Sequence, residues 1–61
     1  MFTFIYFAKL DGNPIYIKPE NVTAIGIKDG VTVIYTVGDT FPFEVKQEVN
    51  DVIELLNSKF V

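Results

Sequence analysis

Residues 45–60, VKQEVNDVIELLNSKF, form the stretch in which apolar residues follow the period of an α-helix. Polar side chains fill the opposite side, so this helix is expected to lie across a sheet with one face toward water. The chain is expected to enter it near Lys46, although no Ser, Thr, Asp or Asn stands at the expected N-cap. The apolar stripe that we predict to be core consists of Val45, Val49, Val52, Ile53, Leu56 and Phe60.

The start of the chain predicts a strand that is apolar on both faces. Phe2, Phe4 and Tyr6 lie on one face, and Ile5 and Phe7 lie on the other. Because one helix can cover only one face of a sheet, the second apolar face has no cover within the 61 residues. We therefore expect an oligomer interface formed by Phe2, Phe4, Ile5 and Phe7. A closed dimer is the default, and a larger ring forms if the first strands pair edge to edge.

Turn residues divide the rest of the chain into short strands. Asp11-Gly12-Asn13-Pro14 predicts a turn, and Pro19-Glu20-Asn21 predicts a bend. Asp29-Gly30 predicts a two-residue type I′ hairpin loop with both residues at positive φ. Gly38-Asp39 predicts a second tight loop, of type II′. The expected strands cover residues 2–10, 15–18, 22–27, 31–37 and 40–45.

This order predicts one α+β domain over residues 1–61. It consists of a small antiparallel β-meander of four to five strands, followed by one C-terminal amphipathic helix packed on the sheet. Gly26 inside the third strand indicates a bulge, a ring lying against bare backbone, or a packing contact. Pro42 cannot donate to a ladder and belongs on an edge strand or at a bulge.

The chain is small for a stable monomer. It contains no cysteine and no histidine, so neither a disulfide nor an ordinary zinc site can stabilise it. Its hydrophobic content of 49%, with six Phe and three Tyr, supplies more apolar surface than one small core needs. Oligomerisation is therefore the expected source of additional stability.

The charge balance bears on the class of partner. All five basic residues are lysine, and eight acidic residues give a net charge of −3 at pH 7. Readers of duplex DNA or RNA need a basic face and usually arginine, so this class is not expected. A small anionic ligand held by lysine or backbone N–H groups stays open. The apolar residues 1–8 are too few to span a bilayer and lack a basic flank, which predicts a cytoplasmic protein without a membrane span.

The residue types needed for most catalytic sites are missing. Without His or Cys there is no usual triad, no thiolate nucleophile and no imidazole ligand. Asp11, Asp29 and Asp39 stand at predicted turns, where solvated structural roles are expected. No calcium loop and no Gly-rich phosphate loop occurs. We therefore expect no catalytic residue, no metal site and no cofactor.

Three tyrosines and two lysines are the candidate binding residues. Flat rings stack on bases and lysine offers a point charge, so together they could form a stacking and anion-binding surface. The alternative is that the tyrosines are cross-strand pairs with exposed hydroxyl groups. The candidate residues are Tyr6, Tyr16, Lys18, Lys28 and Tyr35.

The pattern resembles the FlbD family of small proteins associated with bacterial flagellar and swarming motility. The resemblance runs from about residue 7 to residue 56, and it implies a non-catalytic protein that binds a partner. The segments that carry it are LDGNPIYI at 10–17, PENV at 19–22, the Gly38 turn, and FEVK at 43–46 followed by Val49, Val52 and Ile53.

Two classes of function follow from these observations. The first is a homo-oligomeric module that binds a partner protein, as the resemblance to the FlbD family implies. The second is an inhibitor of the kind produced by phages, which sequesters a host factor or a small nucleotide-like signal. They differ in where the extra apolar surface goes, either to a flat face for a protein or to a cleft between protomers lined by Tyr and Lys.

Overall fold

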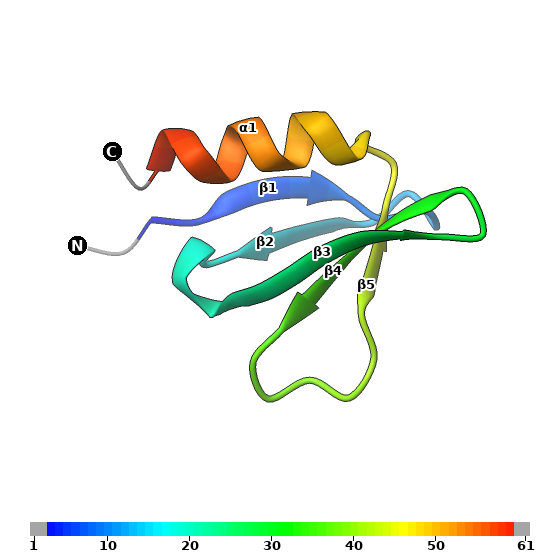
Figure 1. Cartoon of the computed structure of the whole chain (residues 1–61), viewed down its shortest axis with the longest axis horizontal. Coiled ribbons are helices and arrows are strands. Elements are labelled where there is room, and N and C mark those ends of the chain that lie inside the picture. The colour runs from blue at the N-terminus through cyan, green and yellow to red at the C-terminus, as the bar shows by residue number, and fades with distance from the viewer. Residues whose placement is uncertain (1–2, 60–61) are drawn as a thin grey trace.

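The computed structural model describes residues 3–59. Phe2 and Phe60, which were predicted at the interface and in the core, lie outside these residues. Along the chain the structure contains β1 (Ile5–Ala8), β2 (Pro14–Ile17), the 3-10 turn η1 (Pro19–Asn21), β3 (Val22–Lys28), β4 (Val31–Thr36), β5 (Phe43–Val45) and α1 (Val49–Lys59) (Figure 1).

The strands form two antiparallel sheets. β1 pairs with β2, and β3, β4 and β5 form a three-stranded meander with β4 in the centre. The sheets meet where an isolated bridge pairs Lys9 with Val45. Beside it the Lys46 backbone N–H donates to the Ala8 carbonyl at 2.8 Å. The α+β class with a C-terminal helix is confirmed, but the expected single meander is divided between two sheets.

Pairing with β1 explains why α1 begins at Val49 and not near Lys46. The Lys46 backbone N–H is engaged by the Ala8 carbonyl. The Gln47 side-chain oxygen accepts the Ala8 backbone N–H at 3.2 Å. At the start of the helix, the Val52 N–H donates to the Glu48 carbonyl at 3.0 Å. Residues 45–47 therefore join the two sheets before the helix starts.

The helix buries a narrower stripe than the sequence predicted. Val52 and Leu56 are buried and Val49 is half-buried, but Ile53 is 42% exposed. Adjacent helical residues are about 100° apart round the axis, so a helix that points Val52 into the core turns Ile53 toward its flank. The prediction that Ile53 is core is therefore wrong.

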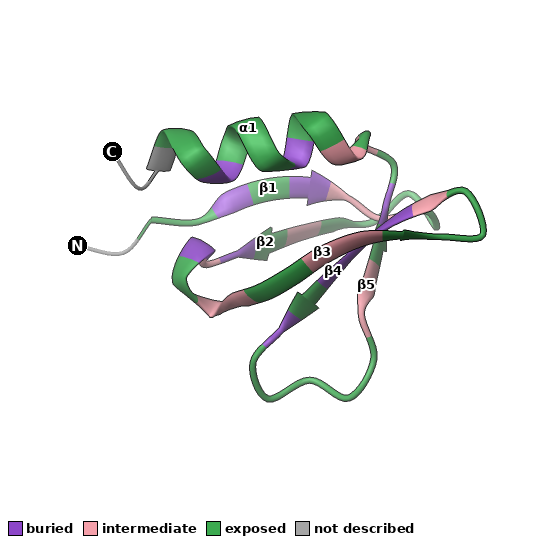
Figure 2. Ribbon diagram, in the orientation of Figure 1, coloured by how far each residue is buried: buried purple, intermediate pink, exposed green. Residues whose placement is uncertain are grey.

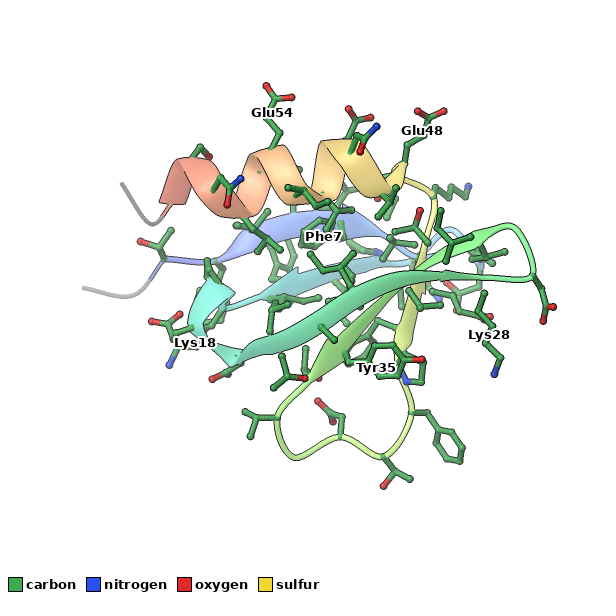
Figure 3. All side chains as sticks on the ribbon, in the orientation of Figure 1. Phe7, Lys18, Lys28, Tyr35, Glu48 and Glu54 are labelled. Carbon is green, nitrogen blue, oxygen red and sulfur yellow. The ribbon has the colours of Figure 1, made fainter. Side chains whose placement is uncertain are left out.

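The core lies where α1 packs along β1 and over the sheets (Figures 1 and 2). Phe7 is fully buried beneath the helix (Figure 3). We expected Ile5 and Phe7 at an oligomer interface, but they belong to this chain's own core because α1 covers their face. The buried cluster consists of Ile5, Phe7, Ile17, Ile34, Val45, Val52 and Leu56.

Of the two tight loops predicted for the meander, the first is present in the structure and the second is not. Asp29 and Gly30 have φ of 52° and 79°, as predicted, and Lys28 pairs with Val31 on either side. The β4–β5 loop, in contrast, covers the six residues 37–42. The prediction of a tight two-residue loop at Gly38-Asp39 is therefore wrong.

A turn over residues 36–39 and a proline explain the longer β4–β5 loop. The Asp39 N–H donates to the Thr36 carbonyl at 3.4 Å, and the Thr36 hydroxyl donates to the Asp39 carboxylate. Gly38, with φ of 85°, is the third residue of this turn, where a type II turn requires positive φ. Since Pro42 has no N–H to donate, β5 begins only at Phe43.

Gly26 is regularly paired with Val33, and the register of β3 shifts between Val22 and Ala24 instead. A Cβ atom at Gly26 would lie 4.0 Å from Val33 Cγ2, an ordinary contact. The bulge in β3 therefore lies earlier than Gly26.

Candidate functional site

The outer side of the β1–β2 ribbon carries exposed aromatic rings. Tyr6 is directly opposite Tyr16, and their ring centroids are 5.7 Å apart with the planes tilted by 57°. Phe4 continues the alternation of β1 on the same side. Phe4, Tyr6 and Tyr16 are 53%, 50% and 62% exposed, and we call them the aromatic face. α1 packs on the opposite side of the ribbon, so the aromatic face is not covered by the helix.

The turn between β1 and β2 fixes the ribbon through local hydrogen bonds. The Gly12 N–H donates to the Lys9 carbonyl, and the Lys9 N–H donates to the Asn13 carbonyl, both at 2.9 Å. The Asp11 carboxylate accepts the Asn13 N–H at 2.9 Å, and this bond, with the nearby Lys9 charge, lowers the pKa of Asp11 below its usual value. Asp11 is exposed and serves the turn.

A pocket of about 170 Å³ opens between β2 and the β4–β5 loop. We call it the β2 pocket. It joins residues from both sheets that are far apart in the sequence. Its lining consists of Phe4, Ile15, Tyr16, Ile17, Lys18, Asn21, Thr36, Val37, Asp39 and Phe43.

The chemistry of the β2 pocket is apolar with two charges. Phe4, Tyr16 and Phe43 supply aromatic carbon, while Lys18 and Asp39 supply opposite charges. Pockets that enclose drug-sized ligands measure about 300–1,000 Å³, so this pocket matches one ring or one apolar side chain. It is too small to enclose a nucleotide.

The structure divides the five candidate binding residues among different surfaces. Tyr16 and Lys18 line the β2 pocket, and Tyr6 lies beside Tyr16. Lys28 is at the far end of the molecule from Lys18, and Tyr35 projects from the meander (Figure 3). Neither Lys28 nor Tyr35 lines the pocket. A single surface that combines all five residues is therefore not present in this chain.

One exposed ring was missed as a candidate. Phe41 is 80% exposed in the β4–β5 loop, and Val37 in the same loop is also exposed. Sequence reasoning placed Phe41 in a strand and gave it no binding role. The signal that could have found it is Pro42, which prevents the strand from extending back to Phe41.

No helix between residues 3 and 59 is both long and apolar enough to cross a membrane. In the same part of the chain, no group of three or more His, Cys, Asp or Glu side chains is placed to hold a metal ion. Comparison with protein families, curated proteins and solved structures gives no match to this chain.

Proposed function

We propose that the protein is a non-catalytic, homo-oligomeric binding module of the cytoplasm that acts by binding a partner protein. The aromatic face carries this proposal. It places the neighbouring rings of Tyr6 and Tyr16, with Phe4 two residues before Tyr6, on a ribbon whose other side packs into the core. Aromatic residues on a rigid scaffold are typical anchors of protein interfaces, because they bury a large area with little loss of side-chain freedom. A motility protein, as the resemblance to the FlbD family implies, is one candidate partner.

A second function, sequestration of a small nucleotide-like signal, is favoured by one observation. Tyr16 and Lys18 line the same pocket, which supplies a ring for stacking and a charge for an anion. The pocket volume of about 170 Å³ argues against it for a single chain. Sequestration would require a second protomer to extend the pocket.

The test uses tagged protein purified from cells under native conditions, with a Tyr6→Glu, Tyr16→Glu double variant and a matched Tyr35→Glu control. Tyr35 is also an exposed tyrosine on a strand, but it lies on the other sheet. We expect wild type and Tyr35→Glu to retain the same partner protein, and the double variant to lose it while keeping its circular dichroism spectrum. Native mass spectrometry of the same samples reads bound small molecules.

Equal retention of the partner by the double variant would remove the aromatic face as the binding surface. A nucleotide bound in stoichiometric amount, with no retained protein, would support sequestration instead. Recovery of neither a protein nor a small molecule would contradict both functions.

A further inference from the structure

The β4–β5 loop contributes Val37 and Asp39 to the lining of the β2 pocket, and Phe41 follows them in the same loop. Phe41 is the most exposed of the large apolar side chains in residues 3–59, and it does not line the pocket. We infer that the protein forms a closed dimer in which Phe41 of each protomer docks into the β2 pocket of the other. This inference rests on the self-association in the proposed function and names the site where it occurs.

The size and lining of the pocket suit one phenyl ring. Its volume of about 170 Å³ is well below that of a pocket for a drug-sized ligand but sufficient for a single side chain. Tyr16 and Phe43 offer aromatic contact to an inserted ring. Aromatic anchors that fill partner pockets dominate the binding energy of many interfaces. The pocket therefore matches Phe41, which is the most exposed ring in residues 3–59.

The position of Phe41 favours a closed dimer over a fibre. An anchor and a pocket on distant parts of a molecule generate open, head-to-tail assemblies, whereas a two-fold contact uses one patch on both copies. Here Val37 and Asp39 line the pocket, and Phe41 follows them in the same loop. A two-fold axis near this loop can therefore place both Phe41 rings in pockets at once.

The distribution of charge also favours the surface around the β2 pocket as the dimer interface. Lys18 and Asp39 both line the pocket, so its two charges cancel and its rim carries no net charge that would repel a second copy. The outer side of α1 instead presents acidic side chains, and Glu48 and Glu54 point away from the sheets (Figure 3). Two copies would repel each other through that surface, in a protein whose net charge is −3.

The first test is sedimentation equilibrium of wild type, Phe41→Asp and Ile27→Asp from micromolar to hundreds of micromolar protein. Ile27 is a matched control, because it is exposed near the other hairpin loop and does not line the pocket. We expect wild type and Ile27→Asp to reach twice the chain mass of 6.9 kDa. Phe41→Asp should raise the dimer dissociation constant by about 30-fold or more, the loss of a hot-spot anchor.

The second test detects the reciprocal contact directly. The chain has no cysteine, so Thr40→Cys protein and Asn21→Cys protein can be mixed and mildly oxidised without competing thiols. Thr40 precedes Phe41 and Asn21 lines the pocket, so docking predicts a disulfide-linked heterodimer. Thr40→Cys mixed with Ile27→Cys should give none. Adding Phe41→Asp to both chains should abolish the heterodimer.

A wild-type dimer that is unchanged by Phe41→Asp and gives no mixed disulfide would overturn this inference while leaving the proposed self-association intact. A wild-type monomer across the whole concentration range would overturn both. An open series of masses above the dimer would exclude the closed two-fold arrangement.

Discussion

Both faces of the β1–β2 ribbon carry aromatic rings, but the two faces have different surroundings. Ile5 and Phe7 belong to the core beneath α1, while Tyr6 between them is half-exposed, and β1 accordingly alternates between buried and exposed colours along its ribbon (Figure 2). The buried face carries only Ile and Phe, whereas the outer face carries two tyrosines whose hydroxyl groups water can solvate. The difference teaches that burial of this ribbon depends on where α1 lies, since the face without a helix stays exposed.

Replacing a ring by alanine on each face in turn should give the largest difference in folding stability. Phe7→Ala removes a fully buried ring, which costs about 3–5 kcal/mol, and a domain of this length has a stability margin of only a few kcal/mol. We expect Phe7→Ala to be unfolded at 25 °C and Tyr6→Ala to remain folded. Urea denaturation followed by circular dichroism, at one fixed protein concentration, measures both variants. Comparable losses of stability would show that the two faces are equally part of the core.

On α1, the difference in stability loss between a buried and a flanking residue should be smaller. Leu56 is buried against the core and Ile53 is on the flank, so Leu56→Ala is expected to cost about 2–5 kcal/mol and Ile53→Ala about 1 kcal/mol or less. The shift in urea midpoint of each variant, at the same m-value, checks this order. A larger loss of stability for Ile53→Ala than for Leu56→Ala would show that α1 turns the Ile53 side toward the core.

The smallest expected effect is the coupling between Tyr6 and Tyr16 on the aromatic face. Their rings are in contact across the strands but exposed, which predicts a coupling of about 0.2–1 kcal/mol in a double-mutant cycle. The cycle uses Tyr6→Ala, Tyr16→Ala and the double variant in a Phe41→Asp background, so that self-association does not contribute. A coupling of several kcal/mol would mean that the aromatic face is a second core and not a binding surface.

Local patterns in the sequence were sufficient for several elements. Asp29-Gly30 fixed its hairpin because only a few residues accept positive φ at both positions of a two-residue loop. The alternation along residues 4–7 gave the correct partition of side chains between two faces. Phe4, Tyr6 and Tyr16 were all expected to meet a ligand, a partner or another chain; the structure shows that they are exposed, and their contact with another molecule stays a prediction.

The sequence by itself determined the class of fold, because helical and strand periods are properties of neighbouring residues. The tertiary structure alone decided the division into two sheets and the start of α1, since both depend on hydrogen bonds between residues 8–10 and 44–47. It also decided which face is core and how Tyr16, Lys18 and Asp39 meet around one pocket. These features arise from pairing between distant segments, which no local pattern of polarity or turn residues specifies.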